Sequence, residues 1–204
     1  MNDYPIATIL GGGGFIGRYL VRNLTKKNFR CFIPTRNTFQ KGHLKTQAPP
    51  GSVELFNWDA NNFGKLKESI ENSDVVINLI GILFETRRQK FNRIHSGIPE
   101  AVAKICAQSD IKKFIHVSAI GANENSKSLY QRSKFQGEKK ALNNFKNTVI
   151  IRPSVVCGTE DNFTNLFSKL SLLPVIPVVG INYKFQPILV SDVADAIVKA
   201  IEAK

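Results

Sequence analysis

The chain has 204 residues, of which 43% are hydrophobic, so it can bury one sizeable core and we expect a single domain. Its formal net charge of +12 favours anionic ligands or partners. No apolar run approaches the roughly 20 residues that span a bilayer, and the opening residues MNDYP do not resemble a signal peptide, so we expect neither a membrane span nor a secreted protein. Cys31, Cys106 and Cys157 lie far apart, which predicts no disulfide framework or zinc site and suits a reducing, cytoplasmic compartment.

Basic side chains concentrate in the first quarter of the chain. No acidic residue lies between Asp3 and Glu54, so eight cations against Asp3 contribute +7 of the +12. These cations are Arg18, Arg22, Lys26, Lys27, Arg30, Arg36, Lys41 and Lys45. Such a field attracts a phosphorylated cofactor, acidic lipid headgroups, nucleic acid or an acidic protein face, although an ordinary solvated basic surface has the same composition.

The segment Ile6 to Arg18, IATILGGGGFIGR, has the pattern of a strand, a tight turn and the start of a helix. Glycines at such a turn let the chain change direction, admit a pyrophosphate close to the backbone and allow the helix to pack on the strand. The spacing fits GxxGxxG through Gly11, Gly14 and Gly17, or GxGxxG if Gly12 is the first glycine. A merely flexible glycine loop has the same letters, but the position between strand and helix favours a dinucleotide-binding turn.

The end of the second expected strand, Arg30 to Thr35, bears on the choice of cofactor. Folds that bind NAD usually place a carboxylate here for the ribose 2′-hydroxyl, whereas folds that bind NADP place an arginine near the 2′-phosphate. Here Thr35 is followed by Arg36, and no carboxylate is near. The pattern therefore favours NADP(H), with NAD(H) as the alternative if Arg36 is an ordinary surface cation.

The rest of the chain alternates helical and strand patterns. We expect a helix whose buried stripe is Ile16, Leu20 and Leu24, and further helices over Lys65–Asn72, Phe91–Ser109 and Val193–Ala203. The further expected strands are Val53–Phe56, Asp74–Ile80 and Phe114–Val117. A loop is expected over Asn37–Ser52. Gly97 and Pro99 predict a kink or irregular turn near the start of their helix, and His95 and His116 are interpreted as structural histidines. The alternation predicts an α/β fold, a Rossmann-type doubly wound parallel sheet with helices on both faces.

Two residues beyond these strands are candidates for cofactor contacts. Asp59, just past Val53–Phe56, can bond an adenine amino group or cap a turn or helix. Gly81, just past Asp74–Ile80, can leave room for a cofactor or simply make a turn.

Tyr130 and Lys134 are the candidate catalytic pair. They lie four residues apart in the helical segment SLYQRSKFQGEKKAL and therefore on one face, one turn apart. An ammonium beside a phenol favours the phenolate, so we expect Lys134 to lower the pKa of Tyr130 toward a range useful for proton transfer. The hydroxyl of Ser118, at the end of the fifth strand, is placed to orient the phenol oxygen. Outside a dinucleotide fold, a half-buried tyrosine and a solvated lysine would explain the same spacing.

The segments GGGGFIG, DVVINLIG, FIHVSAIGAN, YQRSK, IIRPSVVCG and FQPILVSDVADAI together resemble the short-chain dehydrogenase/reductase superfamily over nearly the whole chain. The run RPSVVCGTEDNF followed by KFQPILVSDVADAI is more specific. It is similar to the atypical, epimerase/dehydratase-like branch that contains the dehydrogenase-like accessory subunit of respiratory complex I and its bacterial relatives. Because that branch continues into a C-terminal segment over the substrate side, we expect this segment to be short or missing here.

The resemblance implies a set of site residues. It places Gly11, Gly14, Phe15, Ile16 and Gly17 around the pyrophosphate, Arg36 at the 2′-phosphate, Asp59 and Ala60 near adenine, Leu79, Gly81 and Lys134 near the ribose, and Pro153 and Val156 near the nicotinamide. Tyr130 and Lys134 match the family's proton-transfer pair. A hydroxyl usually stands at the end of the fifth strand in active relatives, and a one-residue change in alignment would put Ala119 there in place of Ser118.

Two functions follow as expectations. The first is an NADP(H)-binding protein of the complex-I-accessory type, whose cofactor is mainly structural and whose basic surface docks on an acidic partner or membrane face, in the cytoplasm or at the inner face of an energy-transducing membrane. The second is an active reductase, dehydrogenase or epimerase, in which Tyr130 transfers a proton and Lys134 holds the ribose. A nucleotide sensor or RNA-binding module is a third class, but no aromatic-rich RNA motif supports it, so nucleic acid is not the expected partner.

Overall fold

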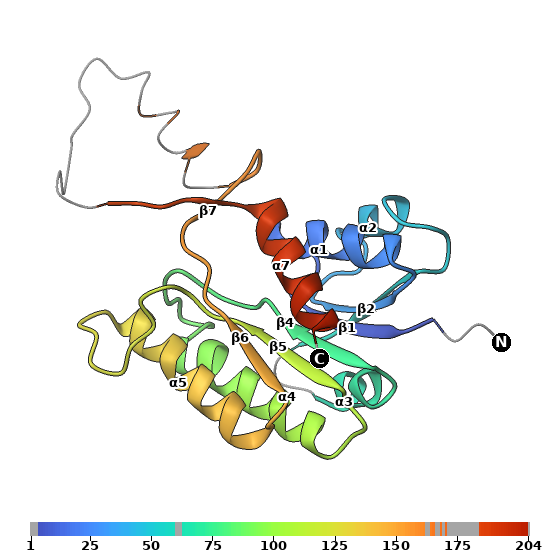
Figure 1. Ribbon diagram of the computed structural model, residues 1–204, viewed down its shortest axis with the longest axis horizontal. Helices are drawn as coiled ribbons and strands as arrows, with labels where there is room; N and C mark the ends of the chain where they lie inside the picture. The colour runs from blue at the N-terminus through green and yellow to red at the C-terminus, as the bar shows by residue number, and fades with distance from the viewer. Residues whose placement is uncertain are drawn as a thin grey trace.

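The structure is a computed structural model that describes residues 4–59, 63–161, 164–165, 168, 170 and 184–203. Its centre is a six-stranded parallel sheet in the order β3-β2-β1-β4-β5-β6 (Figure 1). The strands are β1 (Ile6–Leu10), β2 (Arg30–Thr35), β3 (Val53–Asn57), β4 (Val75–Asn78), β5 (Lys113–Val117) and β6 (Thr148–Ile151). The order reverses between β1 and β4, and ligands of such sheets bind at this point, outside the carboxyl ends of the strands. The expected doubly wound sheet is confirmed.

Helices cover both faces of the sheet (Figure 1). They are α1 (Phe15–Lys26) and α7 (Val190–Glu202) on one face, and α3 (Gly64–Glu71), α4 (Ile98–Ala107) and α5 (Leu129–Asn144) on the other. Successive side chains of a strand point to opposite faces, so Ile9 packs in the cluster that contains Leu20 of α1, whereas Leu10 packs in the cluster that contains Val102 of α4. Both clusters are buried, and they hold the strand ends that form the site in fixed positions.

Three expected elements differ in detail. The loop expected over Asn37–Ser52 contains a short helix, α2 (His43–Thr46). The helix expected from Phe91 begins as a π-helical turn, η1 (Asn92–Gly97), before α4, so the predicted irregularity near its start is confirmed. Strand β4 ends at Asn78, earlier than expected, because the Asn78 side chain accepts a hydrogen bond from the N–H of Ile80 at 3.1 Å and the chain turns there.

Beyond β6, the chain forms a short two-stranded parallel pair, β7 (Val156–Cys157) and β8 (Ile188–Leu189), which leads directly into α7. The last helix therefore begins at Val190, three residues before the expected Val193. No helix within the described part of the chain combines the length and the apolar character needed to cross a bilayer.

Candidate functional site

The glycine turn after β1 has the tight geometry that its sequence predicts. Gly11 has φ +78°, and a Cβ there would lie 3.2 Å from the backbone N of Ile80. A Cβ on Gly17 would lie 2.5 Å from the carbonyl oxygen of Gly11, so only glycine lets α1 pack this closely on the turn. A Cβ on Gly12 would lie 3.0 Å from the side chain of Ile33. The first glycine of GxGxxG, like that of GxxGxxG, therefore stands where a side chain would be crowded.

Helix α1 begins at this turn without a side-chain cap. Its N-cap is Gly14, and no side chain bonds the amides of its first turn. The first amides of a helix have no partner within the helix, and the helix dipole favours negative charge at that end. The turn is therefore suited to a phosphate group.

A cavity of about 350 Å³ opens at the carboxyl ends of β1, β2 and β4. Its wall includes the predicted residues Gly11, Gly14, Arg36, Leu79 and Gly81, and also Gly13, Pro34, Thr35, Lys41, Trp58, Ile80, Ile82, Gln89, Ile94 and Ile98. The structure thus brings together the pyrophosphate turn, the residue expected at the 2′-phosphate and the residues expected at the ribose.

A second, larger cavity of about 850 Å³ lies at the opposite edge of the sheet, but Lys112 and Lys113 in its wall already have partners. Lys112 Nζ lies 2.6 Å from Asp74 Oδ1, and Lys113 Nζ donates to the carbonyl of Ala200 at 2.9 Å near the end of α7. It contains neither the glycine turn nor the start of α1. We therefore place the candidate site at the carboxyl edge.

The cavity at the carboxyl edge contains polar groups that suit a phosphorylated nucleotide. Within the described part of the chain, Arg36 and Lys41 form no ion pair, although both line the wall. A Cβ on Gly13 would lie 2.9 Å from the Lys41 side chain, so the aliphatic part of this lysine lies against the glycine turn. Trp58 is 8% exposed, and its indole N–H has no partner among the described residues. Glycines that leave room, two cations and an unpaired buried donor together fit a dinucleotide phosphate.

Several residues that the resemblance implied lie outside this cavity wall. Phe15 packs at Gly158, where a Cβ would lie 3.1 Å from its ring, and Ile16 packs against the core. Asp59 is next to Trp58 but does not line the cavity, and neither Pro153 nor Val156 does. Ala60 lies outside the described residues.

Sequence reasoning missed Lys41 and Trp58. Lys41 belongs to the basic run noted above, but only the fold of its loop brings it against the glycines. Trp58 is the single tryptophan of the chain and directly precedes Asp59, a residue predicted near the adenine. This adjacency is the sequence signal that could have identified Trp58 as a site residue.

Of the predicted catalytic residues, Lys134 lies beside the Gly81 side of the cavity. Lys134 is 3% exposed and donates from Nζ to the carbonyl of Val117 at 3.0 Å. The same Nζ lies 3.6 Å from the position of a Cβ on Gly81. Ser118 is buried, and its hydroxyl has no partner among the described residues. Tyr130 is half-buried one helical turn before Lys134, as the spacing predicts.

The expected effect of Lys134 on Tyr130 is wrong for this structure. Burial raises the pKa of Tyr130 above its ordinary value, because the phenolate loses solvation. Burial also lowers the pKa of Lys134 to about 8, against the opposing attraction of Glu138. Desolvation therefore sets the direction of the Tyr130 shift, and the expected pairing with Lys134 does not contribute to it.

Two buried histidines remain neutral near this pair. Burial, followed by the charge of Lys134, lowers the pKa of His95 to about 4 and that of His116 to about 3. His116 lies within hydrogen-bond distance of Asn78, 3.2 Å from Nδ1 to Nδ2, which confirms it as a structural core histidine. His95 is 0% exposed but contacts Tyr130, with ring centroids 5.3 Å apart.

We expect these histidines to make the fold sensitive to mild acid. In the unfolded chain they take up a proton as the pH falls below about 6.5, whereas in the folded chain they stay neutral until about pH 4 or lower. The free energy of unfolding therefore decreases over this interval. The measurement is the urea midpoint at about pH 7 and about pH 5. His116→Gln, which has no ionisable group, should show a smaller decrease, and an equal decrease would contradict this cause.

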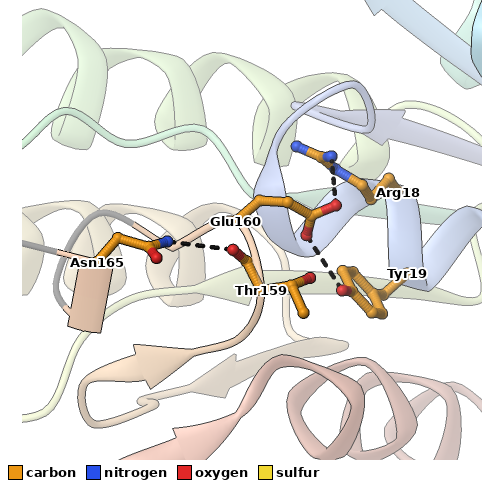
Figure 2. Close-up of polar contacts among 5 residues, drawn as sticks. All are labelled: Arg18, Tyr19, Thr159, Glu160 and Asn165. Atoms are coloured by element: carbon orange, nitrogen blue, oxygen red, sulfur yellow. Dashed lines mark hydrogen bonds and ion pairs between the residues drawn. The ribbon is translucent and has the colours of Figure 1, made fainter. Parts of the chain in front are cut away.

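A set of polar contacts joins α1 to the segment after β7 (Figure 2). Glu160 forms an ion pair with Arg18 at 3.0 Å and accepts a hydrogen bond from the Tyr19 hydroxyl at 3.2 Å. Asn165 donates to the carbonyl of Thr159 at 3.1 Å in the same segment. These contacts hold the chain beyond β7 beside the helix that starts at the glycine turn.

Comparison with known proteins assigns the chain to a family. The model of the NAD dependent epimerase/dehydratase family matches residues 7–204. The chain belongs to this family. Among solved structures, the fold is similar to that of UDP-glucuronic acid 4-epimerase from Bacillus cereus in complex with NAD, with a TM-score of 0.78 and 19% sequence identity. The match covers 98% of this chain and 74% of that one. This likeness supports the fold.

Similar epimerase/dehydratase family sequences include respiratory proteins. The chain is 36% identical to the mouse NADH dehydrogenase [ubiquinone] 1 alpha subcomplex subunit 9, mitochondrial, over 96% of this chain and 52% of that protein. It is 34% identical to the mitochondrial 40 kDa subunit of NADH-ubiquinone oxidoreductase of Neurospora crassa, over 94% of this chain and 50% of that protein. The chain therefore spans about half the length of these relatives.

Proposed function

We propose that this chain binds NADP(H) in the cavity at the carboxyl edge of its sheet. The observation that carries the proposal is the meeting of the glycine turn with Arg36 and Lys41 in one cavity. The turn suits a pyrophosphate, and the two cations suit a further phosphate on the adenosine ribose. Membership of a family named for its NAD dependence supports a pyridine nucleotide.

The preference for NADP(H) over NAD(H) rests on the end of β2. Thr35 and Arg36 stand where a carboxylate would bond a free ribose 2′-hydroxyl. The direct test is to denature freshly purified protein and identify the released nucleotide. NADP(H) in the supernatant supports the assignment, and NAD(H) alone would contradict the role of Arg36.

We further propose that the protein is an atypical short-chain dehydrogenase/reductase of the complex-I-accessory type, in which the nucleotide is mainly structural. Its similarity to two respiratory subunits supports this role. In this role the basic surface docks on an acidic face of a respiratory complex or its membrane. Purified protein should associate with electron-transport membranes and dissociate as salt is added, whereas no salt-sensitive association would contradict the docking role.

A catalytic role is the second candidate, because Tyr130 and Lys134 lie one turn apart on α5 and the Lys134 ammonium lies beside Gly81. A bound nicotinamide supplies or accepts the hydride. Tyr130 would exchange a proton with the substrate oxygen, and Lys134, held by the Val117 carbonyl, would bond the ribose. Substrates would be carbonyl or alcohol compounds, including sugar nucleotides of the epimerase/dehydratase type.

Replacing Tyr130 with phenylalanine separates the two roles. The ring packing is retained, so we expect nucleotide affinity to stay within about threefold of wild type. If the protein is an enzyme, loss of the hydroxyl should reduce kcat by about 10² to 10⁴ because the proton has no carrier. Turnover of an accepted substrate that is unchanged in Tyr130→Phe would exclude Tyr130 as the acid or base.

A further inference from the structure

A continuous set of hydrogen bonds joins the cavity wall to the helix that carries Tyr130. The N–H of Ile82, which lines the cavity, donates to His95 Nε2 at 3.0 Å. His95 Nδ1 lies 2.8 Å from the hydroxyl oxygen of Ser133. The Ser133 hydroxyl in turn donates to the carbonyl of Tyr130 at 2.7 Å. Three separate segments, the loop after β4, η1 and α5, thus meet at one imidazole.

The partners determine the direction of every bond in this set. A backbone N–H only donates, so Nε2 of His95 must accept and the ring proton must lie on Nδ1. Nδ1–H then donates to the Ser133 oxygen, whose own proton is directed to the Tyr130 carbonyl. The imidazole is 0% exposed, so water does not compete for these bonds.

The His95 ring also fixes the position of the Tyr130 ring. Phe91 stacks on His95 with centroids 5.1 Å apart and an interplanar angle of 19°. Tyr130 meets both rings edge to face, at 5.9 Å from Phe91 and 5.3 Å from His95. Edge-to-face pairs have a preferred geometry, so the phenol is held by two neighbours that are themselves held together.

The same imidazole lies close to the wall at Gly81. A Cβ on Gly81 would lie 3.8 Å from His95 Nε2 and 3.6 Å from Lys134 Nζ. His95 therefore sits where the loop after β4, the π-helical turn η1 and the start of α5 approach one another.

We propose that His95 is a positioning residue that couples the cavity wall at Ile82 to Tyr130 and Lys134 on α5. This inference rests on the proposed nucleotide site. The wall on one side and α5 on the other can move independently only if a bond to His95 breaks. Binding of a nucleotide against the wall is therefore transmitted to the phenol and the ammonium, and loosening of α5 is transmitted back to the wall.

Amide hydrogen exchange at Ile82, followed by NMR on the full chain, tests the coupling directly. Ser133→Ala removes the partner of Nδ1 on α5 and leaves Ile82 itself unchanged. We expect exchange at the Ile82 amide to become about fivefold to tenfold faster, because His95 loses its anchor. Ser109→Ala is the matched control, since the Ser109 hydroxyl also donates to a backbone carbonyl, that of Ile105 at 2.9 Å, but at the far end of α4. It should leave Ile82 unchanged.

Two substitutions of His95 separate its two bonds. The amide of His95→Asn reaches only as far as Nδ1, so it keeps the bond to Ser133 and loses Ile82. The amide of His95→Gln reaches as far as Nε2, so it keeps an acceptor for Ile82 and loses Ser133. We expect the Ile82 amide to exchange about tenfold faster in His95→Asn, which leaves it no acceptor, whereas His95→Gln keeps the acceptor but loses the Ser133 anchor and should match Ser133→Ala. Ser133→Ala should have no additional effect in the His95→Gln background.

Nucleotide binding supplies an independent measurement. Trp58 is the single tryptophan and lines the cavity, so energy transfer from its emission to NADPH reports occupancy. His95→Asn should weaken NADPH binding about tenfold, and His95→Gln should stay within about threefold of wild type. If wild type binds no pyridine nucleotide, the proposed function fails. If wild type binds but Ser133→Ala leaves Ile82 exchange unchanged, or makes it still faster in the His95→Gln background, the coupling is overturned.

Discussion

Replacing Gly137 with alanine is expected to lower the free energy of unfolding by about 3 kcal/mol, although alanine is the better helix former. Gly137 lies in the middle of α5, where a Cβ would overlap the carbonyl oxygen of His95 and lie 3.0 Å from its carbonyl carbon. These atoms belong to the backbone of η1, so no side-chain rotation relieves the overlap. The two helical segments must move apart, which removes packing on both sides.

The matched control for this variant is Gly97→Ala. Gly97 has helical angles, φ −69° and ψ −43°, and a Cβ there would make only an ordinary contact at 3.7 Å with the carbonyl of Asn92. Alanine should therefore stabilise the fold by about 0.5 to 1 kcal/mol. Urea unfolding of wild type and both variants measures the difference. A Gly137→Ala protein as stable as wild type would show that α5 does not need the close approach to η1.

The parts of the site that the sequence predicts are those set by backbone geometry. Gly11 and Gly17 are predictable because the turn from β1 into α1 allows no Cβ there. The spacing of the glycines in the local sequence is enough to indicate this turn. Strand β4 is predictable because its four residues are all buried, which a continuous apolar run indicates. The irregular start of α4 follows from Gly97 and Pro99 in the same way.

The parts that the sequence does not predict depend on contacts between distant segments. His95 has an ordinary local context, and its partner Ser133 lies 38 residues away. Lys41 joins the site only because its loop folds over Gly13. The sequence predicts a lowered pKa for Tyr130, but burial of the phenol raises it. The extent of this burial depends on tertiary packing and is not visible in the local sequence pattern.

The second large effect concerns the choice between the two pyridine nucleotides. Arg36 and Lys41 line the cavity and form no ion pair with the described residues, so both cations remain available to an anion. NADP differs from NAD only by the 2′-phosphate, which has oxygens for charge-assisted hydrogen bonds. The two cations should therefore contribute to NADP(H) affinity and contribute little to NAD(H) affinity.

We expect Arg36→Ala to weaken NADPH binding about tenfold to a hundredfold and to change NADH binding less than about threefold. Lys41→Ala should act in the same direction with a smaller effect, because its flexible ammonium forms a single point contact. Lys45→Ala is the control, since Lys45 is an exposed cation of α2 that does not line the cavity. Isothermal titration calorimetry at one salt concentration measures all four proteins with both nucleotides. Equal losses for NADPH and NADH in Arg36→Ala would show that the guanidinium does not contact the 2′-phosphate, whereas a loss in Lys45→Ala as large as that in Arg36→Ala would attribute the preference to overall charge.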